Sequence, residues 1–327
     1  MRRPTTRTAL RAAAAALALS LTLAACAGDG DGGSADPTPT ASSEEAPTPE
    51  ENPTPTAEDI AALEAVTVEG DAGAEPTVTL PSTPFNVSAQ VARLVSDGSG
   101  DVIAEGDLIE LNSVWLNGKD GSKAASSWEN GAPEQIIVNS TKLAAAISEV
   151  LVGGKVGLRF AYAYPGGDEG AQVAVAEVGA KRPGRAVGTP VEPADGLPTV
   201  ELQDNGLPLI KEFVNGPAPT ELIVQPLIEG EGPAVASGQT ITVHYTGWLW
   251  DGKQFDSSWE RGTPFPVENI GAGGVIAGWN EGLVGQKVGS QVMLVVPPEK
   301  GYGEEGSGES IPGGATLVFV VDILAAS

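Results

Sequence analysis

The stretch TVHYTGWLWDGKQFDSSWERGTPF, residues 242–265, decides how the C-terminal third of the chain folds. Its first residues alternate, with Val243 and Tyr245 on one side and His244 on the other, which is the period of a half-buried β-strand. We therefore expect Tyr245 to point inward and His244 to face solvent. The dipeptide at 251–252, Asp-Gly, then supplies the chemistry of a tight turn.

Aromatic and branched apolar residues continue from this turn to the end of the chain. Phe255 and Asp256 place a large ring beside a carboxylate, although only 5% of all residues are aromatic. An acid, tyrosine hydroxyls and several ring faces in one region predict a concave apolar site. The further members of this set are Phe265, Val275, Ile276, Trp279, Tyr302 and Phe319.

Five separated blocks carry a resemblance to a known family. They read VHYTGWLWDGKQFDSS, GTPF, VIAGWNEGL, VGSQVMLVVPPEKGYG and IPGGATLVFVVDIL. Together, and in this order, they resemble an FKBP-type peptidyl-prolyl cis-trans isomerase from about residue 220 to about residue 324. The resemblance implies a rotamase, an isomerase of EC class 5 that acts on X-Pro bonds and has no cofactor. With a single histidine and a single cysteine in the chain, no metal site is expected either.

The resemblance also implies roles for individual residues. Trp279 is the floor on which the proline ring stacks, and Asp256 orients the substrate carbonyl. We expect Arg261 to pair with Asp256 and hold its ionised form in place. The implied catalytic residues are Tyr245, Phe255, Asp256, Trp279, Tyr302 and Phe319. The implied substrate-binding residues are Arg261, Phe265, Val275, Ile276 and Ile311.

Each of these residues also has a purely structural interpretation. The rings of Tyr245, Phe255 and Phe319, and that of Trp279 on a short helix, are equally compatible with an ordinary core. Asp256 and Arg261 would then be a surface ion pair that stabilises the fold by under roughly 1 kcal/mol. Only the joint match of all the blocks favours the functional interpretation.

Three places depart from the family pattern and are expected to reshape the rim of the site. The loop at 271–274, GAGG, is longer and richer in glycine than in relatives. The flap at 306–311, GSGESI, carries serines and a glutamate where relatives have bulkier residues. Trp259 stands where many relatives have a charged residue.

Short motifs recur at a spacing of 131–132 residues, which indicates two copies of one fold. SSWENGAP at 126–133 matches SSWERGTP at 257–264, and LVGGKVG at 151–157 matches LVGQKVG at 283–289. The first copy lacks the residues of the site. Opposite Tyr245, Phe255, Asp256, Arg261, Phe265, Trp279 and Phe319 it has Asn112 or Ser113, Ala124, Ala125, Asn130, Glu134, Ile147 and Ala174.

The predicted class is α+β: two FKBP-like domains, each a twisted antiparallel sheet wrapped around one short helix. In the second copy we expect strands near 221–228, 240–249, 289–296 and 315–324, a short one at 265–267, and a helix near 276–283. The predicted boundaries are a lipoprotein signal peptide at 1–25, a disordered acidic stalk at 26–75, a degenerate domain at 76–183, a linker at 184–197 and the isomerase domain at 198–327.

The N-terminus predicts export and lipid anchoring. Four arginines and an apolar run precede Leu-Ala-Ala-Cys at 23–26, which resembles a bacterial lipobox with Cys26 as the lipidated residue. The alternative is an ordinary cleavage site beside an incidental cysteine. Lipidation would anchor the protein to the outer face of the bacterial cell membrane. A Pro/Thr-rich acidic segment follows and cannot bury enough apolar surface to fold.

The formal net charge of −25 excludes the basic footprint that nucleic-acid binding requires. The expected partners are proline-containing segments of exported proteins, and the resemblance implies macrolides such as rapamycin as ligands of the same site. The leading hypothesis is an isomerase that assists the folding of exported proteins. The alternatives are a polypeptide-binding chaperone or scaffold lipoprotein with little isomerase activity, and a purely structural surface lipoprotein.

Overall fold

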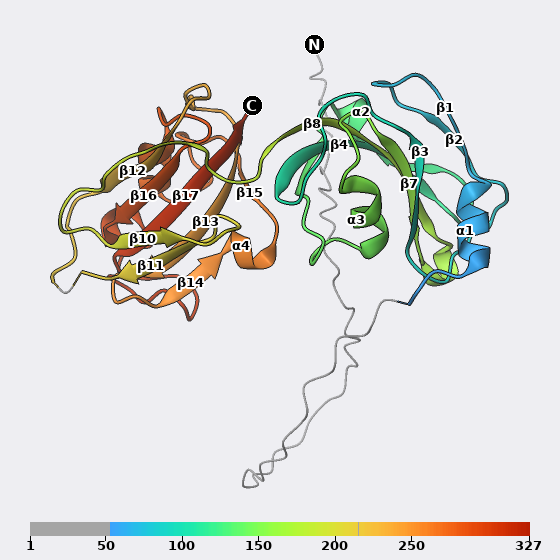
Figure 1. Ribbon diagram of the computed structural model, residues 1–327. Helices are drawn as coiled ribbons and strands as arrows, with labels where there is room; N and C mark the ends of the chain where they lie inside the picture. The colour runs from blue at the N-terminus through green and yellow to red at the C-terminus, as the bar shows by residue number, and fades with distance from the viewer. Residues whose placement is uncertain (1–52, 215) are drawn as a thin grey trace, which may run out of the picture. The chain divides into compact units, whose positions relative to one another are not determined.

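The computed structural model describes residues 53–214 and 216–327, which contain two large antiparallel β-sheets and a few short helices (Figure 1). This content confirms the predicted α+β class. The predicted signal peptide, the predicted lipidation at Cys26 and the stalk up to residue 52 lie outside the described residues. Within the described residues, no helix is long and apolar enough to cross a membrane.

The first sheet contains six strands. Its elements are β3 (Val91–Ser96), β4 (Asp107–Asn117), β5 (Lys123–Ser126), α2 (Ser127–Asn130), β6 (Glu134–Ile137), α3 (Ala145–Leu151), β7 (Arg159–Tyr164), η1 (Gly167–Glu169) and β8 (Gln172–Pro183). The strand order is β3-β7-β8-β4-β5, with β6 paired to β4. Helix α3 buries Ile147 and Leu151 in a core cluster on one face of this sheet.

The other face of the first sheet is covered by α1 (Ala57–Glu64) and the hairpin of β1 (Thr67–Glu69) and β2 (Thr77–Thr79). Leu63 of α1 is fully buried against the strands. The prediction of a disordered stalk over 26–75 is therefore wrong for its last part. The residues from 57 onward fold because they supply apolar side chains to a face that the first sheet would otherwise expose.

The second sheet contains seven strands. Its elements are β9 (Gly188–Pro190), β12 (Ile223–Gly230), β13 (Ile241–Leu249), β14 (Gln254–Ser257), α4 (Ser258–Arg261), β15 (Phe265–Val267), α5 (Ala277–Leu283), β16 (Gln291–Val296), η2 (Pro298–Lys300) and β17 (Leu317–Ala326). The order is β14-β13-β17-β16-β12-β9, with β15 paired to β13. The predicted main strands, the short strand β15 and the helix α5 are confirmed to within a few residues.

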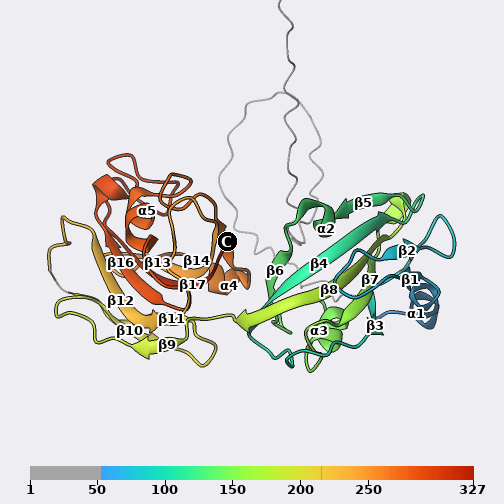
Figure 2. The ribbon, with the colours of Figure 1, turned by 90° about the horizontal axis from the view of Figure 1, so that it is seen from above.

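Both faces of the second sheet are covered. On one face α5 packs with Leu294 and Val292 of β16. On the other face a hairpin of β10 (Thr199–Leu202) and β11 (Pro208–Glu212), which the sequence did not predict, packs against Met293. Figure 2 shows α5 and this hairpin on opposite sides of the sheet.

The segment expected to be a linker, 184–197, is partly built into the second sheet. Its β9 pairs with β12 and forms one edge of this sheet. Just before β9, the Ala186 N–H donates to a carboxylate oxygen of Asp322 at 2.7 Å. The Pro/Gly-rich composition indicated a loop, but it does not reveal backbone groups that find partners on a sheet edge.

The two sheets repeat the same register, which supports the internal repeat. In the second sheet the Tyr245 N–H donates to the Ser258 hydroxyl at 2.8 Å. In the first sheet the Ser113 N–H donates to the Ser127 hydroxyl, also at 2.8 Å. Because Ser127 and Ser258 open the equivalent helices α2 and α4, Ser113 rather than Asn112 is the counterpart of Tyr245.

Candidate active site

Three aromatic rings from three different elements meet on the α5 side of the second sheet. Tyr245 of β13 meets Trp279 of α5 edge to face, with ring centres 5.1 Å apart, and Trp279 meets Phe319 of β17 at 5.3 Å. Phe255 extends the group beside Phe319 at 5.6 Å, and Phe265 extends it beside Tyr245 at 5.7 Å. Edge-to-face packing of this kind holds each ring in one orientation.

A glycine makes room for these rings. Gly247 of β13 lies opposite Phe319 of β17 in the strand register. A Cβ at Gly247 would lie 2.6 Å from the Phe255 ring and 3.0 Å from the Phe319 ring. Because contacts this short do not occur between real side chains, the aromatic cluster requires glycine at this position.

A small polar network borders the aromatic cluster. The Tyr245 hydroxyl donates to one carboxylate oxygen of Asp256, and the Arg261 guanidinium donates to the other. Arg261 also donates to the Tyr245 hydroxyl at 3.1 Å, and its guanidinium carbon lies 5.6 Å from the centre of that ring. The side chains of Asp256 and Arg261 are 36% and 46% exposed, so the network is open to a ligand.

The protonation state of Tyr245 follows from this setting. Burial raises its pKa to about 12, and the hydrogen bond to Asp256 adds to the increase. The hydroxyl therefore stays protonated at neutral pH and remains a donor to the carboxylate.

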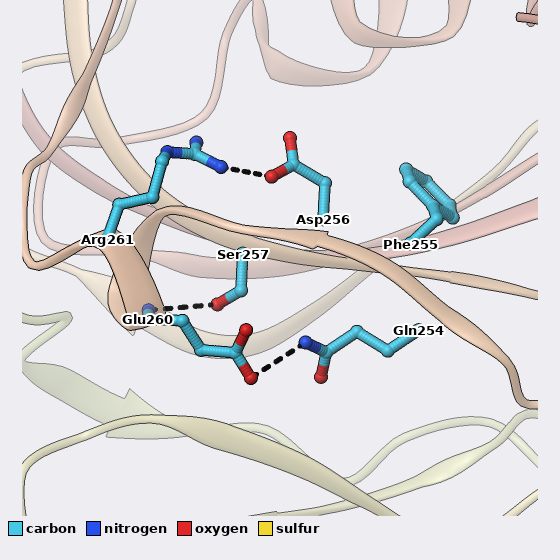
Figure 3. Close-up of a pocket in the computed structure, with 6 residues that line it drawn as sticks. All are labelled: Gln254, Phe255, Asp256, Ser257, Glu260 and Arg261. Carbon is cyan, nitrogen blue, oxygen red and sulfur yellow. Dashed lines mark hydrogen bonds and ion pairs between the residues drawn. The ribbon is translucent and has the colours of Figure 1, made fainter. Parts of the chain in front are cut away.

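An open surface depression runs along β14 and α4. The residues that line it are Gln254, Phe255, Asp256, Ser257, Glu260 and Arg261 (Figure 3). Asp256 and Arg261 face each other above the strand, whereas Glu260 and Gln254 lie below it. The depression is thus lined by Asp256 and Arg261 of the polar network and by Phe255 of the aromatic cluster.

Comparison with known proteins places this arrangement in a family. The family model of FKBP-type peptidyl-prolyl cis-trans isomerases matches residues 232–324. An FK506-binding protein of Streptomyces anulatus is 43% identical over 116 residues, which are 35% of this chain and 93% of the relative. A probable FK506-binding protein of Corynebacterium glutamicum is 46% identical over 118 residues, 35% of this chain and 95% of the relative. An FK506-binding protein of Neisseria meningitidis serogroup B is 48% identical over 103 residues, 32% of this chain and 94% of the relative.

The chain belongs to the FKBP-type peptidyl-prolyl cis-trans isomerases.

The FKBP-type match begins inside the second sheet, so the isomerase activity belongs to this part of the chain. The structure brings nearly all predicted site residues together here. Val275, Ile276 and Ile311 pack against the same core as the aromatic cluster. Phe265 is 37% exposed and Tyr302 is 40% exposed. Burial raises the pKa of Tyr302, and the negative charge of Asp256 contributes.

The first sheet has different residues at the equivalent positions. Trp115 of β4 lies opposite Ala125 of β5, as Gly247 of β13 lies opposite Asp256 of β14. Trp115 is therefore the counterpart of Gly247. Its indole N–H donates to the Ser113 hydroxyl at 3.1 Å, and its ring meets Tyr164 at 6.0 Å. Large rings therefore occupy the region that remains open for Phe255 in the second sheet.

The prediction that His244 faces solvent is wrong. His244 is 2% exposed, and its ring stacks on Trp259 with centres 4.2 Å apart. Its Nδ1 lies 2.9 Å from the Ser258 hydroxyl, and burial lowers its pKa to about 3. Alternation placed His244 correctly on the face opposite Tyr245, but alternation does not reveal what covers that face.

Trp259 was likewise expected at the rim of the site, and the structure shows it on the opposite face of the sheet, stacked on His244. Sequence reasoning missed this contact. The repeated SSW motif was the available signal, because the first copy keeps Trp128 at the same place without keeping the site.

Proposed function

We propose that this protein assists the folding of exported proteins by rotating their X-Pro bonds at the aromatic cluster of the second sheet. The observation that carries the proposal is the oriented carboxylate of Asp256, held by Arg261 and Tyr245 beside the cluster of buried rings. The first copy, which lacks these residues, serves as a scaffold.

The chemistry needs no proton transfer, nucleophile or metal. Rotation about an X-Pro bond is slow because amide resonance must be broken, with a barrier of roughly 18–20 kcal/mol. A site accelerates it by binding the twisted amide better than either planar form. The twisted amide has lost resonance, so an apolar surface that removes water from it favours the twist.

Each residue then has a defined role. The proline ring stacks on Trp279, with Phe319 and Phe255 as neighbouring apolar walls. Asp256 orients the substrate carbonyl region because Arg261 and Tyr245 fix its own position. Further apolar contacts come from Phe265, Val275, Ile276 and Ile311, and hydrogen bonds to the peptide from Tyr302 and the backbone of Ile276.

The location of the enzyme is also part of the proposal. A lipid on Cys26 would anchor the mature protein to the outer face of the bacterial cell membrane. The acidic, Pro/Thr-rich segment that follows would separate the folded part from the lipid surface. Macrolides such as rapamycin would compete with peptides for the same site.

The test compares full-length variants in a cis-to-trans assay with a short Xaa-Pro peptide. Asp256→Ala should lower kcat/KM by about tenfold, which corresponds to the loss of a hydrogen bond to a charged group. Phe265→Ala should also lower it, whereas Glu134→Ala, the matched change in the first copy, should leave it unchanged. Equal activity of the wild type and Asp256→Ala would contradict the proposal.

Two further measurements test the cellular part. The protein should accelerate the slow, proline-limited refolding phase of an unfolded protein, and Asp256→Ala should not. Cys26→Ala should abolish incorporation of labelled lipid and release the protein from the membrane fraction. Retention of Cys26→Ala in that fraction would argue against the lipid anchor.

A further inference from the structure

A segment outside the family match is built onto the isomerase sheet. Residues 185–212, here called the strap, precede the matched residues 232–324 and contain β9, β10 and β11. The strap covers the face opposite α5, where Val200 and Ile210 pack against Met293.

The strap is fixed by a buried carboxylate. Asp322 of β17 is 1% exposed, accepts the Ala186 N–H at 2.7 Å and accepts an amide N–H of Gln291 at 2.7 Å. The first sheet repeats the arrangement, because Glu177 accepts the Gly73 N–H at 2.7 Å from the segment that precedes that sheet. Each sheet therefore uses one carboxylate to attach its preceding segment.

The strap also lies close to one side chain of the isomerase part. Gly206 lies in the turn between β10 and β11. A Cβ at this position would lie 3.1 Å from the Trp259 ring and 3.0 Å from the Arg185 side chain. Arg185 in turn donates to the Asp204 carbonyl at 2.9 Å. Trp259 is thus held between the strap and the ring of His244.

Trp259 lies in the middle of α4, a helix of four residues. Arg261, two residues further on, donates to both Asp256 and Tyr245. A helix this short has little stability of its own, so its orientation depends on the contacts that its side chains make. The largest of its side chains is the ring of Trp259.

We propose that Trp259 is a positioning residue of the isomerase. Clamped between the strap and His244, it holds α4 so that Arg261 keeps Asp256 and Tyr245 in the orientation that the twisted substrate requires. This inference rests on the proposed function of Asp256 and Arg261, and the strap thereby acts on the site from the opposite face of the sheet.

The test is a double-mutant cycle in the full-length protein, with kcat and KM measured on an Xaa-Pro peptide. Trp259→Ala should lower kcat/KM by roughly tenfold, since small displacements of orienting groups cost up to about a hundredfold. Trp259→Phe should restore most of the activity because a ring can still stack on His244. In an Arg261→Ala background, Trp259→Ala should cause no further loss, because both changes act through one group.

The matched control is Trp128→Ala, which removes the equivalent ring from α2 of the first copy and should leave kcat/KM unchanged. Additive losses in the cycle, or an equal loss in Trp128→Ala, would overturn the proposal. If Trp259→Ala does not fold, Trp259→Leu decides. It keeps an apolar side chain next to the strap but removes the ring that stacks on His244, and its loss of activity should again disappear in the Arg261→Ala background.

The proposed function and this inference fail in different ways. If Arg261→Ala and Asp256→Ala keep full activity, the proposed site is wrong. If both lower activity and Trp259→Ala does not, the site stands and the positioning role of Trp259 is wrong.

Discussion

Gln291 lies opposite Asp322 at the position where the first sheet pairs Arg159 with Glu177. In the first sheet the buried carboxylate has a cation, since Arg159 and Glu177 form an ion pair at 2.6 Å. In the second sheet the partner is a neutral amide that donates at 2.7 Å. Among the residues that the structure describes, the second carboxylate is therefore buried without the direct ion pair that the first one has.

Asp322→Asn should change how stability depends on pH. Burial raises the pKa of Asp322 to about 6 from 3.8. Because the folded state then binds the proton more tightly than the unfolded state, the contribution of Asp322 to stability is present below about pH 4 and is lost as pH rises to about 6. The free-energy difference between Asp322→Asn and the wild type should grow by up to about 3 kcal/mol over that range in favour of the variant. Urea unfolding at pH 4 and pH 7.5 measures it, and a constant difference would contradict the expectation.

His244 should change the pH dependence of stability in the opposite direction to Asp322. Its pKa of about 3 lies below the ordinary value of 6.5, so its contribution to stability is present above about pH 6.5 and is lost as pH falls. The first copy suggests a replacement, since Asn112 accepts the Ser127 hydroxyl at 3.4 Å in the equivalent place. Between pH 6.5 and pH 3, the free energy of unfolding of His244→Asn should fall by up to about 5 kcal/mol less than that of the wild type. Thermal melting across this range, compared with the wild type at each pH, gives the result.

Gly247→Ala should disturb the aromatic cluster. The new Cβ would lie 2.6 Å from the ring of Phe255, so the ring must move, at a stability cost of about 1–3 kcal/mol. We expect kcat/KM for an Xaa-Pro peptide to fall by about tenfold or more. Trp115→Ala, at the matching position of the first copy, is the control and should retain activity. Full activity in Gly247→Ala would mean that the position of Phe255 is unimportant.

Asp59→Ala should detach α1 from the first sheet. Asp59 accepts the N–H of Thr56 at 2.8 Å, which caps the helix, and the N–H of Ser88 at 2.6 Å, which joins the helix to the loop before β3. Loss of these charge-assisted bonds should destabilise this part by about 1–3 kcal/mol. Limited proteolysis should cut faster between residues 57 and 75, while isomerase activity stays unchanged. An unaltered cleavage rate would show that the apolar contacts of Leu63 suffice.

The parts of the fold that alternation and repeats describe could be predicted from the sequence. The alternation along β13 and the helix α5 follow from local pattern, whereas the pairing of Arg261 with Asp256 was expected from the family resemblance. The burial of His244 could not be predicted, because it depends on Trp259 of α4, which stacks on the His244 ring and which alternation along β13 does not reveal. The folding of residues 57–75 was missed for a similar reason, since Leu63 is recognisable as a core residue only when the sheet that it covers is known.

The strand β9 has a consequence for any shortened form of this protein. It pairs with β12, which would otherwise be the edge of the isomerase sheet. A fragment that begins at residue 198, the boundary expected from the sequence, would lack β9 and would also leave Asp322 without the Ala186 N–H. Its exposed edge would offer unpaired backbone groups to other molecules, which is a known route to aggregation. A fragment that begins at residue 184 keeps both, and only such a fragment should stay monomeric at high concentration.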